Sequence, residues 1–318
     1  MISKNFKTGG SILMYHRVLP DNIIKHDDNL SVSVSQFKEQ INFLKQKYFP
    51  VSLDDFLKNN SGNKKNQIVI TFDDGYKDNL QYAIPILQEL NVPATIYVTT
   101  RFLENDRSMW WYEIKELLDS NTNKIEFNYN NQNYFFEINK KNSKKFFLNK
   151  ITQIIKNLNK IEQEKLMTAI TKLDHRKQYN SEVLNWDDLK EICKFPLITI
   201  GAHTHNHLSL KNLNENDCLE EIMLSKKLLE DKLGRKIHHF SYPFGSENDV
   251  GEREFKMVES LGFKSAVTTF VKPLFKSDKF SLPRIYIGQK TSKNLLRLKL
   301  SKIYFVLNKL KKNIQLNN

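Results

Sequence analysis

Short apolar segments of strand length alternate with amphipathic helical segments in two stretches of this chain, before residue 100 and after residue 185. Strands that alternate with helices favour a parallel sheet, either open or closed into a barrel. The sequence therefore predicts an α/β fold. The expected strands lie at 11–15, 67–72, 94–98, 197–202, 237–242, 264–268 and 284–287.

Residues 101–185 interrupt this alternation. Alternating apolar residues on both sides of Asn130 predict a β-hairpin, and apolar residues at helical spacing predict two helices after it. The chain has 318 residues, of which 40% are hydrophobic, and can bury a sizeable core. We expect a catalytic domain over 1–289 that carries residues 101–185 as an α+β insertion. The insertion either elaborates the scaffold or forms a lid or substrate rim.

The C-terminal residues 290–318 hold eight basic side chains and no acidic one, which leaves +5 of the net charge of +13 for the rest of the chain. The main body is therefore only mildly basic, and no nucleic-acid-binding module is recognised. The tail predicts a basic amphipathic helix. It either packs on the main domain or, over 295–318, lies on an anionic membrane surface. Its apolar stripe consists of Leu296, Leu300, Ile303, Leu307, Leu310 and Ile314.

Cys193 and Cys218 are the only cysteines, so no disulfide framework is expected. No signal peptide is visible at the start of the sequence, and no run of about 18 apolar residues predicts a membrane span. These features predict a cytoplasmic protein that can associate peripherally with the inner face of the membrane, unless the sequence lacks its native start. They give no indication of the oligomeric state.

Polar clusters follow four of the expected strands. In parallel α/β folds, ligands bind beyond the carboxyl ends of the strands, so four clusters on one face favour a functional site over chance. The clusters are His16-Arg17, Asp73-Asp74-Gly75, His203 to His207, and Tyr242-Pro243-Phe244-Gly245.

The third cluster places His203 and His207 four residues apart, so that both imidazoles can share a metal ion. Asp74 adds a carboxylate, and two histidines with one carboxylate leave a coordination position open for water. The neighbouring Asp73 can then accept a proton from that water. For the histidine spacing alone, a surface turn is the alternative. His205 should point elsewhere.

Thr-Phe-Asp-Asp-Gly at 71–75, followed by His-Thr-x-x-His at 203–207, resembles the polysaccharide deacetylase family, whose catalytic unit is the NodB homology domain. The resemblance covers about residues 10–288, interrupted by the insertion. It implies a distorted (β/α) barrel, a divalent metal, usually zinc, and removal of N-acetyl or sometimes O-acetyl groups from sugars. By motif position, Asp73 would be the catalytic base, and the metal ligands would be Asp74, His203 and His207.

The third family motif is altered in this chain. Many members have an arginine before its Pro-Tyr, where this chain has Phe240-Ser241 before Tyr242-Pro243-Phe244-Gly245. The resemblance implies that Tyr242, Pro243, Phe244 and Gly245 bind substrate, with the Phe244 amide facing the oxyanion. Arg284 is the candidate for the missing charge beside Asp73, and a purely structural role for it is the alternative.

The late Leu-x-His motif that supplies the general acid in many members is absent, since no histidine follows His239. Met14-Tyr15-His16 resembles a subset of the family with Met-Tyr-His on the first strand. His16 is therefore the expected general acid, and His238 and His239 are its rivals.

Together these features predict a metal-dependent hydrolase, with Zn²⁺ as the expected cofactor, that removes an N-acetyl group from an amino sugar. The amino sugar would belong to a glycan or a lipid-linked glycan precursor. If the tail lies on the membrane, a cytoplasmic enzyme cannot reach finished cell-wall polymer, and a lipid-linked or nucleotide-linked glycan precursor is the expected substrate. The alternatives are an O-acetyl esterase or deformylase acting on a sugar, and a metal-binding carbohydrate-binding protein without catalysis. The presence of both Asp73 and His16 favours an enzyme.

Overall fold

The computed structural model describes residues 10–308 with short gaps. Its main body is a closed barrel of parallel strands in the order β1-β12-β11-β10-β9-β6-β5, and β5 pairs back onto β1. The predicted barrel is confirmed. The gaps are residues 25–28, 59–65, 105–107, 121, 174–177, 275–276 and 302. The barrel strands are β1 (Ser11–Tyr15), β5 (Gln67–Phe72), β6 (Ala94–Val98), β9 (Ile198–Ala202), β10 (His239–Ser241), β11 (Ser265–Thr268) and β12 (Leu282–Tyr286).

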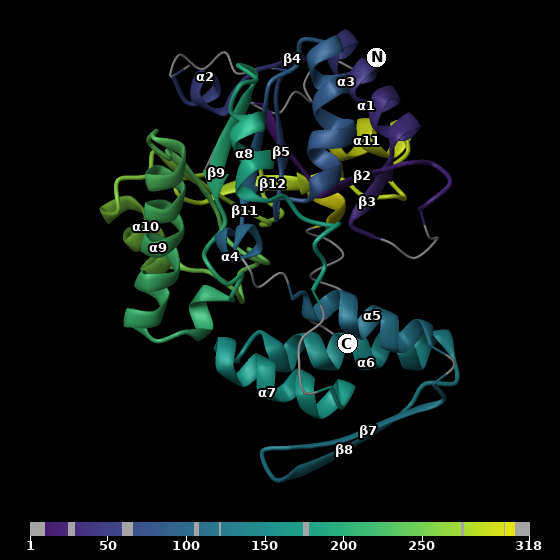
Figure 1. Ribbon diagram of the computed structural model, residues 1–318. Coiled ribbons are helices and arrows are strands. Elements are labelled where there is room, and N and C mark those ends of the chain that lie inside the picture. The colour runs from purple at the N-terminus through teal and green to yellow at the C-terminus, as the bar shows by residue number, and fades with distance from the viewer. Residues whose placement is uncertain are drawn as a thin grey trace.

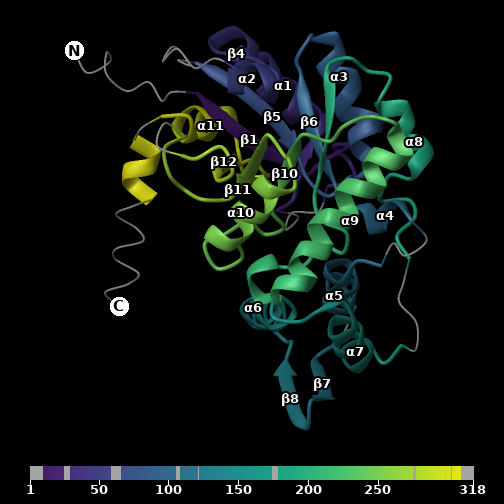
Figure 2. The same cartoon turned by 90° about the vertical axis from the view of Figure 1, so that its left-hand side faces the viewer.

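Helices surround the barrel on its outside (Figures 1 and 2). Their apolar faces and the outward side chains of the strands form the main hydrophobic core, in which residues such as Phe37, Ile70 and Ile222 are fully buried. The helical segments are α1 (Val34–Lys47), α2 (Leu53–Lys58), η1 (Asn79–Ala83), α3 (Ile84–Glu89), α4 (Thr100–Leu103), α8 (Trp186–Ile192), η2 (Leu210–Asn212), α9 (Glu215–Leu233), α10 (Glu252–Ser260) and α11 (Lys293–Lys299). Short strands complete the body: β2 (Arg17–Leu19) pairs with β3 (Ser31–Ser33), and β4 (Phe49–Pro50) extends the sheet beyond β5.

The elements within the predicted insertion form a separate layer beneath the barrel, seen at the bottom of Figure 1. They enclose a hydrophobic core of their own, which includes Phe127, Phe147 and Leu166. The predicted hairpin is confirmed, and its turn is tighter than the run of polar residues suggests. Only Asn130 and Asn131 connect the strands, and both have positive φ, as a two-residue hairpin turn requires. The elements are α5 (Trp110–Asp119), β7 (Lys124–Tyr129), β8 (Gln132–Glu137), α6 (Lys141–Ile155) and α7 (Lys160–Thr171).

The C-terminal segment is not one continuous helix, contrary to the sequence prediction. α11 ends at Lys299, Leu300 caps it, and helical residues resume at Ile303. The side chains of Leu296 and Leu300 are buried in the main core, whereas Leu307 is 50% exposed. The first part of the stripe is therefore packed on the barrel. Leu310 and Ile314 lie outside the described residues. Membrane association of 295–318 stays a prediction.

Among the described residues, no helix has both the length and the hydrophobicity needed to cross a membrane.

The division of the C-terminal segment is testable by the same substitution at two positions. Leu296→Ala should lower the free energy of unfolding by about 2–5 kcal/mol, because it opens a cavity in the core. Leu307→Ala, on the exposed part of the segment, should change it by less than about 0.5 kcal/mol. Urea denaturation of both variants measures the difference, and equal effects would contradict the packing of α11.

Candidate metal centre and its neighbours

The functional candidates gather at the carboxyl ends of the barrel strands. Asp73 and Asp74 follow β5 directly, the histidine pair follows β9, and the Tyr242–Gly245 turn follows β10. Several of these residues adopt left-handed backbone conformations, which are uncommon outside glycine and concentrate at functional sites. The non-glycine examples here are Asp74, Thr204, His207 and Phe244.

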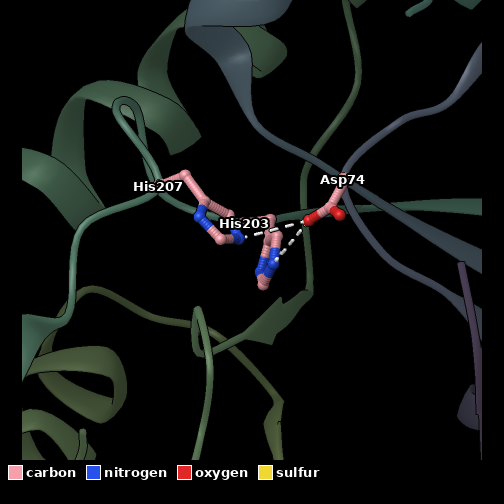
Figure 3. A group of neighbouring side chains, drawn as sticks. All are labelled: Asp74, His203 and His207. Carbon is pink, nitrogen blue, oxygen red and sulfur yellow. Dashed lines mark ion pairs between the residues drawn. The ribbon is translucent and has the colours of Figure 1, made fainter. Parts of the chain in front are cut away.

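Asp74, His203 and His207 meet at one point, with ligand atoms within 4.8 Å of one another (Figure 3). The Nε2 atoms of His203 and His207 lie 3.3 and 3.2 Å from Asp74 Oδ1. All three side chains are largely buried. The predicted ligands are thus brought together.

The donor set fits a metal ion. Asp74 Oδ1 is buried and receives no hydrogen bond of good geometry from any described residue. An oxygen left in that state is costly unless a cation or proton satisfies it. Two imidazole nitrogens and one carboxylate oxygen are a common zinc ligand set that leaves a position open. Burial alone would raise the pKa of Asp74, but the two histidines outweigh it and hold that pKa well below its usual value.

Glu221 on α9 stabilises the loop 203–207, which carries the two histidines of the centre. Its carboxylate accepts hydrogen bonds from the backbone and side-chain amides of Asn206, and its own carbonyl accepts from the His205 amide. His205 itself turns away, as expected, and its Nδ1 lies 2.9 Å from Thr100 Oγ1. Glu221 is not among the residues predicted from the sequence. In the sequence, its role is indicated by the position of an acidic residue on the apolar stripe of α9, between Cys218 and Ile222.

Arg284 on β12 forms a two-pronged ion pair with Asp73. Its Nη1 and Nη2 donate to the two carboxylate oxygens at 2.7 and 2.6 Å, and both side chains are almost completely buried. Nη2 also donates to Ser241 Oγ at 3.0 Å, and Nη1 donates to Thr71 Oγ1 at 3.1 Å. Arg284 therefore lies beside Asp73, in the place hypothesised for it from the sequence.

The ion pair also sets the charge of Asp73. Burial alone would raise the pKa of this carboxyl group. The Arg284 guanidinium, together with His203, outweighs burial and lowers the pKa below its usual value. Asp73 is therefore ionised at neutral pH, as a proton acceptor must be.

His16 follows β1 and is half-buried at the same end of the barrel. Its Nδ1 is buried without a hydrogen-bond partner among the described residues, and its carbonyl accepts from Asn79 Nδ2 at 2.8 Å. The rival His239 lies at the amino end of β10, fully buried, with Nδ1 2.9 Å from Ser265 Oγ and Nε2 3.5 Å from Asp54 on α2. It faces the opposite end of the barrel from Asp73. His238 precedes it in the chain and lies no closer to the carboxyl end of β10.

The residues of the turn after β10 differ in their burial and in the direction of their side chains. Phe244 is half-buried, and its ring lies 5.1 Å from that of His207. Pro243 and Gly245 are buried beside it. Tyr242 is only 1% exposed, and its hydroxyl donates to the Phe280 carbonyl in the main core. The Tyr242 side chain therefore points into the core. Substrate binding by Tyr242, Pro243, Phe244 and Gly245 stays a prediction.

The protein is thus a parallel α/β barrel with a candidate metal centre of one carboxylate and two histidines at the carboxyl ends of its strands. The family model for polysaccharide deacetylases matches residues 60–169 and 148–266. The chain belongs to the polysaccharide deacetylase family.

Two curated relatives match over part of their length. A putative polysaccharide deacetylase, YxkH of Bacillus subtilis, is 23% identical over 262 residues, which are 81% of this chain and 63% of the relative. A poly-β-1,6-N-acetyl-D-glucosamine N-deacetylase of Staphylococcus aureus is 30% identical over 167 residues, 48% of this chain and 57% of the relative. This chain thus spans about three fifths of the length of each.

Two solved structures share the fold across almost the whole chain. The deacetylase PplD of Streptococcus pyogenes, in complex with acetate, superposes with a TM-score of 0.61 at 20% identity and covers 92% of this chain and 98% of its own. IcaB of Ammonifex degensii gives a TM-score of 0.60 at 17% identity, over 92% of this chain and 97% of its own. Both alignments extend beyond the barrel strands, and both structures support the fold.

The buried ion pair predicts a non-additive effect of two substitutions. Arg284→Gln alone leaves the Asp73 carboxylate buried and unpaired, and should lower the free energy of unfolding by about 3–5 kcal/mol. Adding Asp73→Asn removes that charge, so the double variant should recover most of the loss. Urea denaturation of the single and double variants measures the coupling. Strictly additive losses would show that the two side chains do not depend on each other.

The support from α9 predicts an effect on metal binding. Glu221→Ala removes the carboxylate that accepts two hydrogen bonds from Asn206, in the loop that carries both histidines, and should weaken Zn²⁺ binding about 10–100-fold. The control is Glu220→Ala, at the exposed neighbouring position on the same helix, which should bind Zn²⁺ as the natural protein does. Competition titration with a chromophoric chelator measures both. Equal affinities would contradict the role of Glu221.

Proposed function

We propose that this protein is a metal-dependent hydrolase that removes an N-acetyl group from an amino sugar within a glycan or a lipid-linked glycan precursor. One observation carries this proposal. An ionised carboxylate, Asp73, is fixed by Arg284 directly beside a buried Asp–His–His centre. A metal-dependent acyl hydrolase needs these two parts as neighbours, because one binds the metal and the other removes a proton from water.

The amino-sugar substrate is supported by the relatives. The Staphylococcus aureus relative is named as an N-deacetylase of poly-β-1,6-N-acetyl-D-glucosamine, and it is 30% identical over the matched segment. We extend to this chain the N-acetylated sugar as substrate class, and prefer it over an O-acetyl ester or a formyl group.

In the proposed mechanism, Asp74, His203 and His207 hold a divalent metal, with Zn²⁺ as the expected ion. When bound, the metal supplies Lewis acidity that polarises the acetamide carbonyl and makes the attacking water more acidic. Asp73 accepts the proton from that water. The Arg284 fork keeps the carboxylate ionised and holds it in one orientation, while the hydroxyls of Ser241 and Thr71 accept further hydrogen bonds from Nη2 and Nη1.

Charge that develops on the carbonyl oxygen requires donors from the protein. We assign this role to the backbone N–H of Phe244, in the turn after β10. His16, protonated, donates a proton to the departing sugar nitrogen, so that acetate and a free amine leave. Its unpartnered Nδ1 and its place at the carboxyl end of β1 support this role.

The experiment that tests this function is an assay for acetate. The protein, reconstituted with Zn²⁺ or Co²⁺, should release acetate from N-acetylglucosamine oligosaccharides and leave a free amine. Release only from O-acetylated sugars would favour the esterase alternative. Binding of the oligosaccharide without release of acetate would favour the non-catalytic one.

The role of Asp73 is tested by Asp73→Asn, which keeps the size of the side chain and removes its basicity. Acetate release should fall by about 10²–10⁴-fold, while the bound metal stays at one equivalent per chain. Metal content measured on the same sample separates loss of the base from loss of the site. Near-normal acetate release by this variant would exclude Asp73 as the base.

A further inference from the structure

The two histidines of the metal centre are supported in different ways. His203 Nδ1 donates to the Ser241 carbonyl at 2.7 Å, which fixes the ring with Nε2 towards Asp74. His207 Nδ1 is buried and has no hydrogen-bond partner among the described residues. A metal-binding histidine is ordinarily oriented by a hydrogen bond at its second nitrogen. His207 therefore needs another means of orientation.

Two aromatic rings pack close to the ring of His207. The Trp111 ring lies 5.3 Å from it at an interplanar angle of 53°, and the Phe244 ring lies 5.1 Å away at 65°. Both separations are in the range at which aromatic pairs attract each other and resist rotation. The ring of His207 is thus held by packing, between one residue of α5 and one of the β10 turn.

Trp111 is itself fixed by the barrel, although it belongs to α5. Its Nε1 donates to the Tyr76 hydroxyl at 3.3 Å, and its ring lies 5.9 Å from that of Phe102. Tyr76 is fully buried and directly follows Gly75 in the Asp-Asp-Gly segment. The neighbouring Trp110 packs against the separate core of the insertion, and its ring also lies 5.5 Å from that of Trp111. The two adjacent tryptophans therefore connect the insertion core with the contacts of Trp111.

The insertion also contacts Phe244, the second ring beside His207, through Lys156, the residue that caps α6. Its ammonium group lies 3.0 Å from Asp249, which is buried, and 4.4 Å from the centre of the Phe244 ring. Of the two rings beside His207, Trp111 thus belongs to the segment 101–185, and Phe244 is contacted by it. Docking of this segment and the orientation of a metal ligand depend on shared contacts.

We propose that Trp111 is a positioning residue for His207, and that the segment 101–185 completes the metal site by docking against it. This inference rests on the metal site of the proposed function. It assigns the segment a purpose other than elaborating the scaffold: without its aromatic contact, His207 rotates away from the direction of Asp74, and the affinity for the metal falls.

The test compares three variants of the full chain by titration with Co²⁺, whose visible absorption reports the coordination geometry. Trp111→Ala should bind Co²⁺ at least about tenfold more weakly and with an altered spectrum, as for the loss of an outer contact to a ligand. Trp111→Phe keeps an aromatic ring and should restore affinity to within about threefold of the natural protein. Leu118→Ala, which weakens the core of the insertion at the other end of α5, should keep the natural affinity and spectrum.

Natural affinity and spectrum in Trp111→Ala would overturn the proposal, as would an equal loss in Leu118→Ala. If Trp111→Ala does not fold, Lys156→Ala provides the second measurement, since it removes the other contact without touching His207. That variant should bind Co²⁺ about threefold more weakly, and unchanged binding would again overturn the proposal. Failure of the natural protein to bind Co²⁺ would instead contradict the metal site, and with it the proposed function.

Discussion

The paired hydrogen bonds between Arg284 and Asp73 are the interaction on which the arrangement of the site depends. Two opposite charges in a barrel interior are stable only when they are closely matched, because each has lost its water. The match here requires β12, β5 and β10 to be in register, since the guanidinium also binds Thr71 and Ser241. Closure of the barrel therefore brings the two side chains together, and their contact keeps Asp73 ionised. Arg284 pairs with Asp73, whereas the two histidines lie at Asp74, so that the two adjacent carboxylates have different surroundings.

Around this centre, support comes from outside the barrel strands. Glu221 on α9 binds the loop of the two histidines, and Trp111 on α5 packs against His207. These elements bury apolar surface, and each also contributes one side chain to the site. An α/β barrel can vary such surrounding segments while its strand ends stay fixed, because the loops and helices contribute little to closure of the sheet. The segment 101–185 is an example: it has its own core, and still reaches both rings beside His207.

Much of the fold and of the metal centre could be predicted, because local sequence patterns are sufficient to indicate them. The β5 and β9 strands are nearly continuous apolar runs, and the polar residues that end them are next to them in sequence. Asp74, His203 and His207 could therefore be assigned to one edge of the sheet from the sequence alone. The hairpin of β7 and β8 was equally local. The prediction of one continuous C-terminal helix was wrong, since the apolar stripe continues past Leu300 whereas the packing against the barrel does not. The motif did not indicate that the Tyr242 side chain points into the core, because a motif does not show on which side of the backbone a side chain lies.

The sequence by itself determined the alternation of strands and helices, the ligand spacing, and the presence of an acidic pair after a buried strand. These depend on neighbours within a few residues, where periodicity and chain direction fix the geometry. Only the tertiary structure decided which distant side chains meet. Arg284 lies 211 residues from Asp73 in the chain, and Trp111 is on a different element from His207, yet each is in contact with its partner. No local pattern records such a meeting, because it results from closure of the sheet and from the docking of a separate core.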